Sequence, residues 1–154
     1  MSPDIPLQKP KAILNAERAL WLWTIWMCVF GIFQTKADIP DIEEVITTQL
    51  QGMVSISPQA MLVTAVCGYA VLALISIWII FKIGAGKNWA RASLLGGFAL
   101  DLTCTLWSSY HDITGYLTGI PDLGLQIFAI TMLYTAPGSL WFQKPKTVPA
   151  QAAP

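Results

Sequence analysis

Hydrophobic residues along this chain are gathered into four long runs that short charged segments separate. The runs cover residues 18–35, 60–82, 92–110 and 123–142, close to the roughly 20 apolar residues that a helix needs to cross a bilayer core. Between their flanking charges, the second and fourth runs have no charged residue, and the third has one, Asp101. Because backbone groups in lipid must be bonded within their own segment, the pattern predicts an all-α membrane protein with four antiparallel transmembrane helices.

The basic residues are distributed unevenly among the segments between these runs. Eight of the nine Lys and Arg residues lie up to the first residue of the first run, from the last residue of the second run to the start of the third, or after the fourth, and only Lys36 lies on the other side. The positive-inside rule therefore predicts that both termini are cytoplasmic. Residues 1–142 form one predicted four-helix domain, and the Pro- and Ala-rich tail, residues 143–154, is predicted to be disordered.

The first outer connection, residues 36–58, is long for a helical hairpin and has a helical pattern of its own. Its apolar residues recur at helical spacing, and Asp41 with Glu44 three residues later fits a capping box. Those apolar residues are Ile42, Val45, Ile46, Leu50 and Met53. We therefore predict an amphipathic helix on the outer membrane surface. It is either a lid or docking surface, or simply a connector that lies flat.

Composition supports a membrane location and excludes several other classes of protein. The 154 residues are 55% hydrophobic and 12% charged, with nine Lys and Arg against nine Asp and Glu, whereas soluble domains have about 25% charged residues. Zero net charge argues against a nucleic-acid-binding surface, and three cysteines in hydrophobic runs do not form the framework of a small secreted domain. The chain is therefore predicted to be a multi-pass membrane protein whose main partner is the lipid bilayer.

Two short motifs next to the predicted spans resemble those of a known group. The inner connection reads G-x-G-K-N-W-A-R, and the last run ends T-x-P-x-S-x-W-F. In this arrangement the chain resembles a widespread group of small, uncharacterised bacterial four-helix inner-membrane proteins. The residues that carry the resemblance are Gly84, Gly86, Lys87, Asn88, Trp89, Ala90 and Arg91, with Thr135, Pro137, Ser139, Trp141 and Phe142. The resemblance implies a bacterial cytoplasmic membrane and no particular reaction.

The inner connection is also the predicted contact with the membrane surface. Lys87 and Arg91 can meet anionic headgroups, Trp89 can anchor the depth of the hairpin, and Asn88 suits a tight turn. The Gly86-Lys87 pair is not a phosphate-binding loop, because Asn88 follows it and the flanking segments are membrane helices.

Residue types that serve enzymes and metal centres are sparse. The one histidine, His111, is flanked by Ser108, Ser109 and Asp112, but catalytic triads are assembled from distant segments. His111 is interpreted as an interfacial residue, with a proton sensor as the alternative. Cys28, Cys67 and Cys104 could bind a soft metal such as Cu(I), but no C-x-x-C motif accompanies them. We predict that the chain is not an enzyme and has no metal or cofactor.

Asp101 is the most informative residue of the sequence. It lies near the middle of the third run, where an ionisable side chain costs roughly 2.5–3.5 kcal/mol to insert and usually faces the interior of a bundle. Thr105 and Ser108 share its face of the predicted helix. The candidate partners at a matching depth are Thr24, Tyr69, Thr131 and Tyr134. Asp101 could hold the bundle together, contact another membrane protein, or bind a proton or cationic solute during transport.

These observations predict a non-catalytic protein that acts through helix contacts with another membrane component. An accessory partner is one form, and an immunity protein against a membrane-targeted toxin is another. The alternative is a proton-coupled small-solute transporter that works as a homo-oligomer around Asp101. The predicted binding residues are Asp101, Thr105, Ser108, Tyr69, Thr131, Tyr134 and His111.

Overall fold

The structure is a computed structural model in which residues 9–49, 57–109 and 113–143 are described. This part contains four α-helices, one short 3₁₀ helix and no strand. The elements are α1 (Lys11–Gln49), α2 (Pro58–Gly84), α3 (Asn88–Ser109), α4 (Ile113–Tyr134) and η1 (Gly138–Phe142). The predicted all-helical fold is confirmed at this level.

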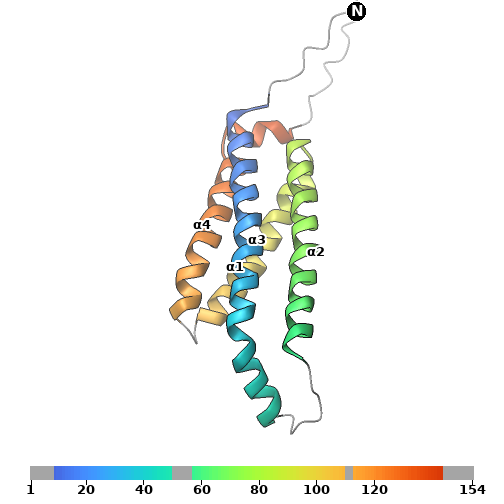
Figure 1. The fold of residues 1–154 in the computed structure, drawn as a ribbon. Coiled ribbons are helices and arrows are strands. Elements are labelled where there is room, and N and C mark those ends of the chain that lie inside the picture. Colours follow the sequence, from blue (N-terminus) through green and yellow to red (C-terminus); the bar gives the residue numbers. More distant parts are fainter. Residues whose placement is uncertain (1–8, 50–56, 110–112, 144–154) are drawn as a thin grey trace, which may run out of the picture.

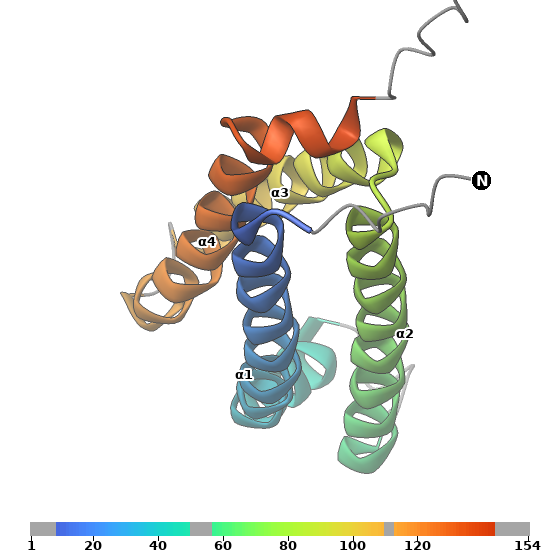
Figure 2. The same cartoon turned by 90° about the horizontal axis from the view of Figure 1, so that it is seen from above.

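Helix α1 is the centre of the bundle. It packs against both α2 and α4, and α3 packs mainly against α4. Helix α3 crosses behind α1, from the upper end of α2 towards the lower end of α4 (Figure 1). Seen from above, η1 lies across the end of the bundle where α1 begins (Figure 2).

Helix α1 is longer than the sequence pattern predicts. Its 39 residues continue without a break beyond residue 35 to Gln49, through Pro40. The prediction of a separate surface helix over residues 42–53 is therefore wrong: residues 42–49 extend α1, and residues 50–53 lie outside the described part of the chain. Pro40 removes one backbone donor and crowds the preceding turn, which bends a helix without necessarily ending it. Figure 1 shows the lower part of α1 bending away from the bundle.

Helix α4 begins and ends earlier than the predicted run of residues 123–142. It begins at Ile113, and so includes Pro121 and Asp122, and it ends at Tyr134. Pro137 cannot continue a helix, and the chain turns there into η1. The correction moves Asp122 from the predicted outer connection into the helical bundle.

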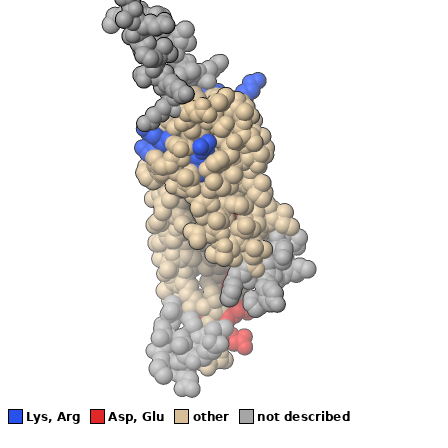
Figure 3. Space-filling model, turned by 180° about the vertical axis from the view of Figure 1, so that it is seen from behind, with Lys and Arg blue, Asp and Glu red and all other residues tan. Residues whose placement is uncertain are grey.

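Charged and buried residues are segregated along the bundle. We call one end the basic end, because Lys9, Lys11, Arg18, Lys82, Lys87 and Arg91 lie there, and the other the acidic end, defined by Asp38, Asp41, Glu43 and Glu44. The exceptions are Glu17, which pairs with Lys9 at 2.7 Å, and Lys36, which lies towards the acidic end. Figure 3 shows basic side chains at one end, acidic side chains at the other, and an uncharged surface between them. The largest fully buried apolar side chains are Ile13, Leu20, Ile83 and Leu133, and they pack in one cluster that includes Phe142.

The uncharged surface between the two ends is strongly apolar. Phe33 is 70% exposed, Leu74 67% and Leu100 71%, which is unusual for a protein surrounded by water. Helix α2 and the Lys11–Glu44 part of α1 are each long and apolar enough to cross a membrane. Two candidate membrane-spanning helices are therefore present in the described part of the chain.

Candidate functional site

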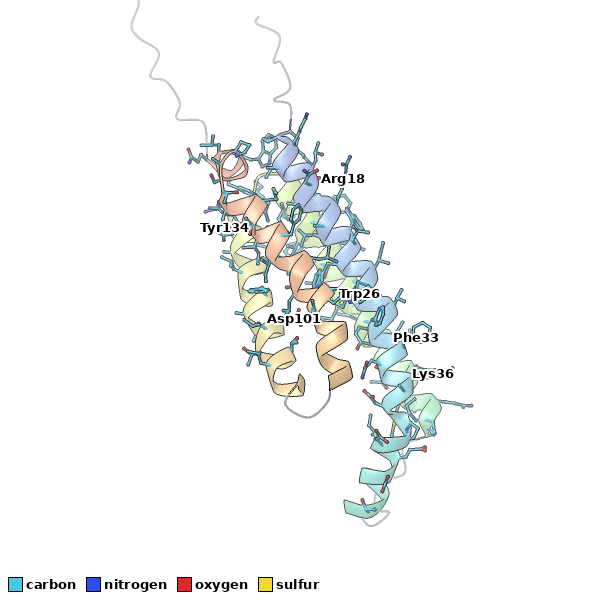
Figure 4. All side chains as sticks on the ribbon, turned by 90° about the vertical axis from the view of Figure 1, so that its left-hand side faces the viewer. Arg18, Trp26, Phe33, Lys36, Asp101 and Tyr134 are labelled. Atoms are coloured by element: carbon cyan, nitrogen blue, oxygen red, sulfur yellow. The ribbon has the colours of Figure 1, made fainter. Side chains whose placement is uncertain are left out.

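A cavity of about 640 Å³ lies between the four helices, in the half of the bundle nearer the acidic end. Its lining extends from Trp26 to Asp41 on α1, a rise of roughly 22 Å along a helix. Figure 4 shows Trp26 and Asp101 near the middle of the bundle, with Lys36 further towards the acidic end. The cavity therefore runs from the acidic end to about mid-depth.

Four carboxyl groups line this cavity. Asp38 and Asp41 come from α1, Asp101 comes from α3 and Asp122 comes from α4. Among the residues that the structure describes, no Lys or Arg is part of the lining. The cavity therefore has acidic groups from three helices, and its described lining supplies no side-chain cation to neutralise them.

Gln126 joins the two deeper carboxyl groups. Its Nε2 atom donates to Oδ2 of Asp101, across the α3–α4 contact, and to Oδ2 of Asp122 at 3.3 Å, one turn away on α4. Gln126 is only 1% exposed. A primary amide carries two N–H donors, so one buried glutamine can hold both carboxyl groups at the edge of the cavity.

Aromatic side chains form another part of the wall. Trp26 and Phe30, one turn apart on α1, are stacked with ring centroids 3.9 Å apart and an interplanar angle of 24°. Tyr69 of α2 lies against Gly31, where a Cβ atom would overlap the tyrosine ring. Glycine at position 31 therefore lets the Tyr69 ring lie against the backbone of α1.

The structure brings some of the predicted partners to Asp101 and leaves others apart. Tyr69 and Thr105 line the cavity together with Asp101. Thr24 and Thr131 instead donate to carbonyl groups of their own helices, at 2.9 and 2.8 Å. Neither residue lines the cavity, so the idea that they hold Asp101 is not supported by its geometry.

Two further predicted residues lie where the structure gives no side-chain information. His111 is outside the described residues. Ser108 is in α3, but its side chain is not described. Their predicted parts in binding stay predictions.

Tyr134 belongs to a different cluster, at the basic end. The guanidinium carbon of Arg91 lies 4.4 Å from the centroid of the Tyr134 ring and 5.0 Å from that of Phe142. Gly86 has a φ of 69° and faces the carbonyl and indole of Trp141. We call Arg91, Tyr134 and Phe142 the basic-end cap. Together with the Gly86–Trp141 contact, it joins the two motifs that carry the resemblance.

The remaining residues of the inner connection surround this cap. Lys87 lies in the turn before α3, and Asn88 is the first residue of that helix. Trp89 packs against Trp78 of α2, with ring centroids 4.9 Å apart. Arg91 contacts the rings of Tyr134 and Phe142 within the protein, in addition to any contact with headgroups.

Asp122 and Gln126 are among the site residues that sequence reasoning missed, and so are the aromatic pair and the two carboxyl groups of α1. Asp122 was assigned to a connection, because the apolar runs were delimited by charged residues and the fourth run was therefore started at residue 123. A usable signal was present: Asp122 and Gln126 are four residues apart, and Gln126 is a polar residue inside an apolar run. Polar residues at that spacing share one face of a helix.

Comparison with protein-family models, curated proteins and solved structures finds no match to this chain. The resemblance to small bacterial inner-membrane proteins therefore stays a prediction. The function has to be inferred from the cavity and from the distribution of charge and apolar surface.

Proposed function

We propose that this chain is a four-span protein of the bacterial cytoplasmic membrane, with the basic end and both termini in the cytoplasm. Three observations support the proposal: the apolar surface between the charged ends, the two helices that are long and apolar enough to span, and the position of the basic residues at one end. Lys and Arg favour the cytoplasmic side of a membrane. The cavity would then be reached from the outer side.

Within that membrane, the proposed activity is cation binding coupled to proton movement, as in a small-solute transporter. The observation that carries it is the cavity at Asp101 and Asp122, with no basic side chain in the described lining. Intramembrane carboxyl groups are costly and commonly mark ion or proton pathways. Because the described residues that line the cavity come from one chain, the proposed binding does not require the homo-oligomer that the sequence alone suggested.

Proton exchange in proteoliposomes tests this proposal. Vesicles with an acidic lumen and a pH-sensitive dye would receive Na⁺, K⁺ or quaternary ammonium ions from outside. The expected result is alkalinisation of the lumen by at least one of these cations, and loss of the signal in Asp101→Asn. Glu44→Gln is the matched control, because Glu44 is at the acidic end but does not line the cavity. Equal exchange by Asp101→Asn, or no exchange with any cation, would contradict the proposal.

A second candidate function is contact with another membrane component, and one observation favours it. The end of α1 beyond Pro40 extends past the other three helices at the acidic end (Figure 1), and Ile42 on this extension is 40% exposed. An accessory partner or a membrane-targeted toxin could dock there. Ile42→Asp should then lose a protein that co-purifies from native membranes while proton exchange is kept; an unchanged set of co-purifying proteins would argue against this role.

A further inference from the structure

We infer that the ligand of this cavity is a small organic cation, a protonated amine or a quaternary ammonium group. The inference rests on the cavity of the proposed function and adds the chemical class of its ligand. It is carried by the size of the cavity, its aromatic wall and the sign of its charge.

The size of the cavity favours a molecule over a bare ion. Its volume of about 640 Å³ lies within the roughly 300–1,000 Å³ typical of small-molecule sites. A metal ion is held by oxygen atoms that converge at about 2.0–2.6 Å. Here only Asp101 and Asp122 are held together, by Gln126, whereas Asp38 and Asp41 lie nearer the acidic end.

The aromatic wall suits a cation with a weakly hydrated surface. Trp26 and Phe30 form a stacked pair on α1, and Tyr69 faces the same cavity from α2. The face of an aromatic ring attracts ammonium groups, and tryptophan does so most strongly. An organic ammonium ion can place its carbon atoms against these rings and leave its charge near the carboxyl groups.

The carboxyl groups are placed so that they can guide such a cation inwards. Asp41 and Asp38 come first on the path from the acidic end, and Asp122 and Asp101 lie deeper. A cleft lined with charge of one sign raises the local concentration of the opposite ion. Lys36 is on the same helix, but it is exposed and is not part of the lining.

Direct binding tests this inference without requiring transport. The purified full-length chain in lipid nanodiscs would be titrated with radiolabelled benzyltrimethylammonium, with neopentylbenzene as the uncharged molecule of the same shape. We expect saturable binding that neopentylbenzene does not displace. Trp26→Leu and, independently, Phe30→Leu should each weaken binding by about tenfold. Phe33→Leu is the control, since Phe33 is on the same helix, 70% exposed and outside the lining.

The outcomes separate this inference from the function on which it rests. If benzyltrimethylammonium does not bind while Na⁺ or K⁺ drives proton exchange, the ligand class is wrong and the proposed function stands. If neopentylbenzene displaces the label equally, or Phe33→Leu weakens binding as much as both aromatic variants, the inference is also overturned. If benzyltrimethylammonium binds as expected but no cation drives exchange, the ligand class is supported and transport is contradicted.

Discussion

The two ends of the bundle are built in different ways. At the basic end, apolar side chains from α1, α2, α3, α4 and η1 pack into a buried cluster, and Arg91 is held between Tyr134 and Phe142. Towards the acidic end, the same helices separate around a cavity with four carboxyl groups. Gln126, which is 1% exposed, marks the boundary between the two regions.

Because of this difference, the cavity is open towards the acidic end and closed towards the basic end. A cation can approach Asp101 from the acidic end, but the buried cluster and the basic-end cap lie between the cavity and the other end. Binding therefore needs only the arrangement described here, whereas transport requires the basic end to open. Changes at the basic end should alter stability most, and changes at the acidic end should alter ligand binding.

The largest expected effect is from a methyl group added at the closed end. Gly138 is buried, and a Cβ atom there would overlap the backbone carbonyl oxygen of Met132. Because backbone cannot move aside as a flexible side chain can, Gly138→Ala should lower the free energy of unfolding by about 3 kcal/mol. Titration with SDS in mixed micelles, followed by tryptophan fluorescence, measures the change.

The matched control for this change is Gly97→Ala. Nothing lies within 4 Å of a Cβ atom at position 97, and alanine favours a helix over glycine by up to about 1 kcal/mol. The control should keep or raise stability. Similar losses for both variants would mean that packing at η1 does not close the basic end.

A smaller effect is expected at the boundary between the two regions. Gln126→Leu removes the amide that donates to Asp101 and Asp122, and leaving polar groups without their donor should cost about 2 kcal/mol. Gln34→Leu serves for comparison, because Gln34 lines the cavity but is exposed, and its one side-chain hydrogen bond among the described residues is a long one, to Asp38 at 3.5 Å. Equal unfolding free energies for the two variants would show that Gln126 does not hold the carboxyl groups in place.

The smallest expected effect on stability is from a substitution in the basic-end cap. Lysine keeps the charge of Arg91 but lacks the planar group that stacks on Tyr134 and Phe142. Arg91→Lys should therefore lower the free energy of unfolding by about 1 kcal/mol. Arg18→Lys, an exposed substitution at the same end, should change it little. The prediction fails if the two substitutions have the same effect in SDS titrations.

Much of the fold could be predicted, because it depends on long apolar runs that are local features of the sequence. The limits of α1 and α4 could not, since a proline allows more than one outcome. Pro40 and Pro121 lie inside helices, whereas Pro137 follows the end of one. Whether a proline lies inside a helix or ends it depends on the packing around that residue, and the pattern of apolar and polar residues does not report this packing.

The candidate site was predicted only in part, for a related reason. Asp101 and Tyr69 were selected by depth in the predicted spans, and Thr105 by its helical spacing from Asp101. The structure places all three on one cavity. Depth alone also selected Thr131 and Tyr134, which face elsewhere. Asp122 was missed because its depth depends on where α4 begins. The depth of a residue in a span does not say which way that residue faces. The rotation of each helix about its axis decides which polar residues meet.

The reactivity of the native thiol Cys104 tests whether the cavity is acidic and open at the acidic end. Cys104 and Cys67 are both exposed free thiols, but only Cys104 lines the cavity with Asp101. In a Cys28→Ser, Cys67→Ser background, sealed vesicles would be treated with the cationic 2-(trimethylammonium)ethyl methanethiosulfonate or the anionic 2-sulfonatoethyl methanethiosulfonate. An acid-lined cavity open at the acidic end predicts that the cationic reagent reacts about tenfold faster than the anionic one, and only from that side. Equal rates for the two reagents, or equal reaction from both sides, would contradict the account.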